Sequence, residues 1–196
     1  MDKSPFSPIL EDLVRRVGGS EAVALVDLGG ETVDYAGSAA PYDIKVAAAH
    51  WRIILAQLAE VPRLGRPRVL LVRSSKKSVI VRALPDDYAL VVLLVRRSGF
   101  MASNRALSHC EKALAREAGW ELDPNETSWF AVSVECDARR RPTRIVYGGL
   151  EEPVEVLGSL VGMSRREIGF RARLASGPEI TLIREAGSFW YVEESG

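Results

Sequence analysis

Residues 89–95 form the longest apolar run in the chain, with seven apolar residues in succession. The run is too short to cross a bilayer. It is rich in valine and leucine and follows the turn-forming residues Pro85-Asp86-Asp87. A strand that is apolar at every position has to be covered on both faces. We therefore predict a central strand at residues 88–96 inside a layered domain.

The segments around this strand alternate between helical and strand patterns. Helices are predicted from Ser7 as N-cap and Pro8 at the first helical position up to Gly18-Gly19, at 43–60 and at 103–118. Strands are predicted at 22–28, 32–36, 68–73, 78–84 and 88–96. This order of one helix, two strands, a long helix, three strands and a helix predicts an α/β (α+β) domain over residues 1–122.

The pattern changes after Asp123-Pro124-Asn125, which we interpret as a linker. From there on, only short strand-like runs separated by Gly, Pro or Arg are found. They lie at 129–136, 143–147, 154–157, 168–174, 179–183 and 189–192. Six strands and no helix predict a second, all-β module over residues 126–196, either a small barrel or a highly bent sheet.

The long helix at 43–60 carries two apolar stripes. One stripe places Ile44, Ala48, Trp51, Leu55 and Leu58 toward a core. On the opposite side, where a solvated helix would carry charges, stand Val46, His50, Ile53 and Gln57. A helix with two such faces packs against something on both sides. The second stripe is therefore our candidate for an interface with a second copy or a partner.

The charge balance argues against a protein dedicated to nucleic acid. The chain has 26 basic and 26 acidic residues, so its formal net charge is zero, whereas nucleic-acid affinity comes mainly from neutralised phosphates. Arg139-Arg140-Arg141, with Arg144, could contact phosphate, but no aromatic residue is interleaved with them. We interpret this run as a solvated loop and keep nucleic-acid binding as the weakest hypothesis.

The sequence offers little for catalysis, and we expect no enzyme, no cofactor and no metal site. The phosphate-cradling, dinucleotide, metalloprotease, nucleophile-elbow and calcium-loop motifs are missing. His50 and His109 fall on the outward sides of two helices, and the pairs Asp86-Asp87 and Glu151-Glu152 are expected in turns. Cys110 and Cys136 lack metal-ligand spacing and are interpreted as buried, inert thiols.

Within residues 6–120, the order of elements resembles the roadblock domain family. Two soft motifs carry the resemblance, ALVDLGG at 24–30 and LPDDYALVV at 84–92. The family is named for a dynein light chain and includes bacterial MglB-like regulators of small Ras-like GTPases. The arginine excess, 21 of the 26 basic residues, likewise suggests a bacterial origin.

The resemblance implies a five-stranded antiparallel sheet between helices, with the long helix on one face. It also implies a homodimer whose long helices lie side by side and dock a small Ras-like GTPase. On this sequence, Val46, His50, Ile53 and Gln57 would form the dimer or partner surface. Arg52, Arg63 and Arg66 would make electrostatic contacts with the partner.

Two functions follow from this resemblance. The leading one is a non-catalytic regulatory scaffold that binds a GTPase and stimulates its GTP hydrolysis. The alternative is a structural adaptor that recruits a polarity, motility or signalling protein through residues 126–196, with no effect on GTP turnover. We expect either protein to be cytoplasmic, because the sequence has no membrane-spanning run and its N-terminus has no apolar targeting segment.

Overall fold

The computed structural model describes residues 4–63, 65–96, 103–122, 129–147, 149–164 and 167–193. The chain divides into two compact units. The first joins residues 1–103 with 110–122, and the second joins 104–109 with 123–196. The linker expected at Asp123-Pro124-Asn125 lies outside the described residues. Two domains at 1–122 and 126–196 therefore remain a prediction.

The first unit contains a five-stranded antiparallel sheet in the order β2-β1-β5-β4-β3. Its strands are β1 (Ser20–Val26), β2 (Thr32–Gly37), β3 (Val69–Arg73), β4 (Lys77–Ala83) and β5 (Ala89–Val95). The central strand is β5, and every residue of β5 except Val95 is buried. The prediction from the apolar run is confirmed, since both faces of this strand are covered.

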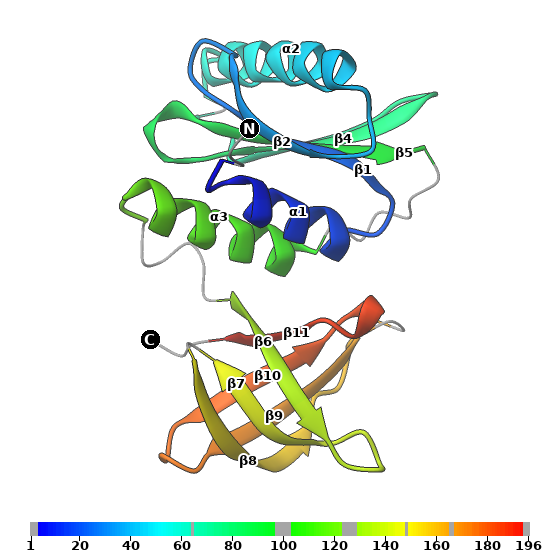
Figure 1. The fold of residues 1–196 in the computed structure, drawn as a ribbon, viewed down its shortest axis with the longest axis vertical. Helices are drawn as coiled ribbons and strands as arrows, with labels where there is room; N and C mark the ends of the chain where they lie inside the picture. The colour runs from blue at the N-terminus through cyan, green and yellow to red at the C-terminus, as the bar shows by residue number, and fades with distance from the viewer. Residues whose placement is uncertain are drawn as a thin grey trace. The chain divides into compact units, whose positions relative to one another are not determined.

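Three helices cover the sheet: α1 (Ser7–Arg16), α2 (Pro41–Ala59) and α3 (Asn104–Ala118). As Figure 1 shows, α2 lies over one face and α1 and α3 lie over the other. The core under α2 consists mostly of small and β-branched residues from the helix and the three inner strands β1, β4 and β5. Its buried members are Ala22, Ala24, Val26, Ile44, Ala48, Leu55, Val79, Val81, Ala89, Val91 and Leu93.

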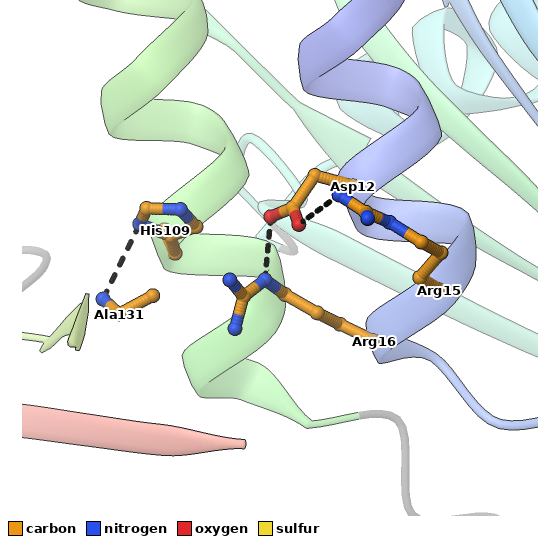
Figure 2. Close-up of polar contacts among 5 residues, drawn as sticks. All are labelled: Asp12, Arg15, Arg16, His109 and Ala131. Atoms are coloured by element: carbon orange, nitrogen blue, oxygen red, sulfur yellow. Dashed lines mark hydrogen bonds and ion pairs between the residues drawn. The ribbon is translucent and has the colours of Figure 1, made fainter. Parts of the chain in front are cut away.

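Helix α1 starts differently from the expectation. Phe6 occupies the N-cap position, and no side chain caps the helix. The Ser7 hydroxyl instead donates a hydrogen bond of 2.8 Å to Asp34 Oδ2 on β2. The predicted Ser7 cap is therefore wrong, because the hydroxyl is used to bond the helix to the sheet. Further along α1, Asp12 receives ion pairs from Arg15 and Arg16 (Figure 2).

Gly37 at the end of β2 is the position where glycine is required. Its φ is +124°, a region that other residues rarely adopt. A Cβ there would lie 2.3 Å from the Glu21 carbonyl oxygen and 2.5 Å from Ala22 Cα on β1. The glycine therefore permits the two strands to approach at the end of the hairpin.

The second unit contains a closed six-stranded barrel in the order β10-β11-β6-β7-β8-β9. Its strands are β6 (Trp129–Cys136), β7 (Pro142–Tyr147), β8 (Leu150–Ser159), β9 (Ile168–Leu174), β10 (Glu179–Arg184) and β11 (Trp190–Glu193). The buried interior is formed by Ile145, Phe170, Ala172, Ile180, Leu182, Trp190 and Val192. Of the two predicted forms, the small barrel is the observed one.

Strand β8 is longer than predicted and contains Glu151-Glu152, which were expected in a turn. The chain reverses before them, and Gly149 has a φ of +82°. Glu151 then lies opposite Val146 on β7 and pairs with the Arg144 guanidinium. The expectation was wrong because this ion pair between strands satisfies a carboxylate that the sequence pattern assigned to solvent.

Candidate partner interface on helix α2

The inward face of α2 has an unexpected member. Ile44, Ala48 and Leu55 are buried as predicted, but Arg52 is buried with them at 6% exposure. Its Nε donates to the Asp87 carbonyl oxygen at 3.1 Å and so holds the turn between β4 and β5. We therefore leave Arg52 out of the proposed partner contacts.

The outward face of α2 carries the second apolar stripe. All four members, Val46, His50, Ile53 and Gln57, are exposed, with 37% exposure for Val46 and 50% for Ile53. We call these four residues the outer stripe. Tyr42 and Ile54 are also exposed on this helix, and the sequence pattern did not assign either of them to the stripe.

The exposed surface of α2 is almost without charge. From Val46 to Ala59 the only Asp, Glu, Lys or Arg is Arg52, which is buried. The charged residues lie toward the helix ends, where Lys45 Nζ lies 5.8 Å from the centroid of the Tyr35 ring and Glu60 follows the last turn. An exposed helix face with aliphatic side chains and no charge is typical of a protein interface.

Two cations follow the helix. Arg63 and Arg66 are exposed in the segment that leads from α2 to β3. Arg63 has a φ of +68° and Gly65 one of +73°, so the chain turns sharply here. The two guanidinium groups therefore belong to the loop at the C-terminal end of the outer stripe.

A second group of exposed apolar residues was not found from the sequence. Val69 and Leu71 alternate with half-buried residues on β3, which is an edge strand of the sheet, and are 42% and 48% exposed. Residues 69–72 are apolar at every position. The sequence therefore gave no signal for which face of this strand is covered.

In the second unit, charged and aromatic groups surround Arg105. Its Nη1 lies 2.6 Å from Glu167 Oε1 and 2.6 Å from Glu185 Oε1, and its guanidinium lies 4.7 Å from the Trp129 ring centroid. Burial opposes the charged form of Glu167 and so favours a higher pKa, but the hydrogen bonds from Arg105 and Ser164 outweigh burial and lower the pKa. Glu167 is therefore held ionised.

The pattern of α3 predicted an outward polar side containing His109. His109 is instead half-buried, and its Nδ1 accepts a hydrogen bond of 3.3 Å from the Ala131 N–H (Figure 2). The expectation of an outward His109 is therefore wrong. Helical periodicity identifies a polar face, but not the groups that pack on it.

Among the described residues, no group of three or more His, Cys, Asp or Glu could hold a metal ion. Asp86 and Asp87 lie in the 3-10 turn η1 (Pro85–Asp87), as predicted. Cys110 is buried, as expected, and burial raises the pKa of its thiol. Cys136 is exposed, which corrects the expectation of a buried thiol. No helix in the described part of the chain has the length and hydropathy needed to span a membrane.

Comparison with known proteins identifies the fold of the first unit. No family model and no curated protein matches the sequence significantly. Among solved structures, MglB of Myxococcus xanthus aligns with a TM-score of 0.51 at 16% identity, over 61% of this chain and 98% of that one. A roadblock/LC7 domain of Streptomyces avermitilis aligns with a TM-score of 0.51 at 18% identity, over 58% and 97%. The N-terminal part of this chain has the roadblock fold.

Proposed function

We propose that this protein is a non-catalytic, cytoplasmic regulator that forms a homodimer through α2 and binds a small Ras-like GTPase. The observation that carries the proposal is the exposed and uncharged outer stripe on a roadblock fold. Apolar side chains that stay in water do not contribute to the stability of the protein. Burying them against protein is favourable in proportion to the apolar area covered.

The dimer is supported by the form of the outer stripe. Most homodimers use one patch that contacts its own copy across a twofold axis, so the patch has to complement itself. A straight stripe of Val46, Ile53 and two uncharged polar residues meets this condition, because no like charges would be brought together. Two α2 helices packed in this way would form one continuous helical surface.

The GTPase is supported by the fold and by the exposed arginines that follow the outer stripe. GTP hydrolysis takes place on groups and Mg²⁺ held by the GTPase itself, so a regulator can act by ordering those groups. Such a role needs neither a nucleophile nor a phosphate loop. Arg63 and Arg66 stand exposed in the loop that follows the outer stripe.

GTP turnover tests this proposal. A Ras-like GTPase encoded next to this chain would be assayed alone, with the wild-type chain, and with Val46→Glu. Val146→Glu provides the matched control, because Val146 lies on the barrel and has nearly the same exposure, 39% against 37%. We expect binding and altered turnover with wild type and Val146→Glu, and neither with Val46→Glu.

The same assay separates the proposal from the adaptor alternative. Binding without any change in GTP turnover would favour an adaptor that recruits its partner through the barrel. If the wild-type chain neither binds the GTPase nor changes its turnover, the proposed function is wrong.

A further inference from the structure

One end of the barrel combines exposed arginines with an exposed aliphatic side chain. Neighbouring strands of this barrel are antiparallel, and all but the pair of β11 and β6 follow one another in the chain. The turn between β6 and β7, the loop between β8 and β9 and the connection between β10 and β11 therefore lie at the same end. Figure 1 shows the β6–β7 turn and the β10–β11 connection on the same, right-hand side of the barrel, the turn at the lower edge and the connection at the upper edge.

The turn between β6 and β7 presents Arg139, Arg140 and Arg141, all exposed. Its backbone is fixed by Asp137, whose Oδ1 accepts the N–H of Arg139 at 2.8 Å and that of Arg141 at 2.9 Å. The Asp137 carboxylate therefore accepts hydrogen bonds from the backbone of its own turn. No ion pair joins any of the three guanidinium groups to a carboxylate in the described part of the chain.

The other described carboxylates in these connections form ion pairs. Glu167 and Glu185 both bind the Arg105 guanidinium at 2.6 Å. On the barrel wall, Arg144, Arg171 and Arg173 each have a glutamate partner. The β6–β7 turn, residues 137–141, thus has a net charge of +2, from three arginines and Asp137, although the chain as a whole is neutral.

The loop between β8 and β9 adds an apolar side chain. Val161 is 94% exposed, the highest exposure of any large apolar residue described. The base of its loop is held by a hydrogen bond of 2.8 Å from the Leu160 N–H to the Gly169 carbonyl oxygen. Leu160 packs against Gly169, where a Cβ would lie 2.7 Å from Leu160 Cδ1. Val161 therefore follows directly on a residue that is anchored at the base of the loop.

From this combination we infer that the β6–β7 and β8–β9 end of the barrel binds the surface of an anionic phospholipid membrane. The interfacial layer of such a membrane attracts arginines electrostatically and accepts aliphatic side chains among its acyl chains. Nucleic acid could bind the arginines through its phosphates, but it has no apolar layer that would bury Val161. Neither the β6–β7 turn nor residues 160–164 contain an aromatic residue that could stack on bases.

The proposal is independent of the GTPase and is tested by sedimentation of the full chain with lipid vesicles. One set of vesicles is neutral, and in the other about a third of the lipid is anionic. We expect binding to the anionic vesicles alone, weakening as salt is raised. Replacing Arg139, Arg140 and Arg141 together with alanine should weaken binding roughly 100-fold, since each arginine near such a surface contributes about fivefold.

Two matched controls distinguish binding by this local surface from nonspecific electrostatic or hydrophobic binding. Replacing Arg144, Arg171 and Arg173 with alanine removes the same charge from paired positions and should leave binding within about threefold of wild type. Val161→Asp should weaken binding, whereas Leu150→Asp should not. Leu150 is 76% exposed and begins β8, at the opposite end of the barrel.

Three results would overturn the inference. They are failure of the wild-type chain to sediment with anionic vesicles, equal loss of binding in both triple variants, and binding of duplex DNA at concentrations that leave vesicles free. The last result would assign the arginines to nucleic acid instead. Thermal unfolding of each variant confirms that the exposed substitutions leave the fold intact.

Discussion

Arg82 on β4 and Glu111 on α3 form a buried ion pair. Arginine Nε and Nη2 lie 2.9 and 2.5 Å from the same glutamate oxygen, Oε2. The two side chains are only 13% and 5% exposed. A charge in such a place is tolerated only with its partner, so the pair fixes how α3 lies against the sheet.

Removing one member of this pair should destabilise the protein strongly. We expect Glu111→Ala to lower the free energy of unfolding by about 3 to 5 kcal/mol, because Arg82 stays buried without a partner. Urea denaturation measures the loss. The double variant Arg82→Met/Glu111→Leu should recover most of it. As a control, Glu179→Ala breaks exposed pairs with Arg171 and Arg173 and should have no measurable effect. A Glu111→Ala variant as stable as wild type would contradict this prediction.

The two cysteines should differ in reactivity. Cys136 is exposed and should react with a thiol reagent in the native protein, whereas Cys110 should react only after denaturation. The count of reacted thiols with and without urea checks this. Two thiols reacting at the same rate in the native protein would show that α3 does not shield Cys110.

The buried thiol of Cys110 also leads us to predict that the stability of the protein depends on pH. Burial raises the pKa of its thiol above the value in the unfolded chain. The stabilisation is therefore complete below the unfolded pKa of about 8.5 and declines as the pH rises above it. Cys110→Ala should lessen the decline measured by denaturation in alkaline buffers, even though the variant is less stable at neutral pH. An unchanged decline would assign the effect to other groups.

Residues 1–122 should fold without the barrel. The sheet and α2 form their own core, and α3 beyond Cys110 belongs to the same unit. A fragment of residues 1–122 should therefore unfold cooperatively on heating, as followed by circular dichroism. Gradual unfolding of the fragment would mean that the barrel completes the roadblock core.

Arg63 and Arg66 should affect binding of the GTPase more than its chemistry. Both lie in a loop with left-handed backbone positions, whereas an arginine finger has to be held rigidly against the transition state. Arg63→Ala or Arg66→Ala should lower the affinity for the GTPase and make that affinity less dependent on salt. Arg171→Ala, on the barrel, is the control. A loss of about 1000-fold in maximal turnover with binding intact would instead identify an arginine finger.

Much of the fold could be predicted because local patterns and tertiary contacts agree. The apolar run of β5 indicated a central strand. The helix predicted at 43–60 corresponds to α2, which begins two residues earlier, at Pro41. Strand β5 buries every residue but Val95, and α2 buries Ile44, Ala48 and Leu55 of its predicted inner stripe, while Trp51 and Leu58 are half-buried. The start of β8 was missed because Glu151 was assigned to a turn, whereas it lies on the strand and pairs with Arg144 of β7.

The candidate site was predicted less completely. Helical periodicity selected the outer stripe correctly as exposed, but it could not show that Arg52 is buried. Arg52 follows Ala48 by one helical step, and its Nε donates to the carbonyl oxygen of Asp87, which is distant in sequence. His109 was misplaced for a similar reason, since its partner, Ala131, follows 22 residues later.

Sedimentation equilibrium of the wild-type chain and of Ile53→Glu, at tens of micromolar, tests most directly whether the outer stripe is an interface. The wild-type chain should have twice the mass of one chain. Ile53→Glu should have the mass of one chain, because the new carboxylate would be buried without a partner across the interface. Ile168→Glu, an exposed substitution on the barrel, should remain dimeric. A wild-type chain that is monomeric at these concentrations would contradict the account.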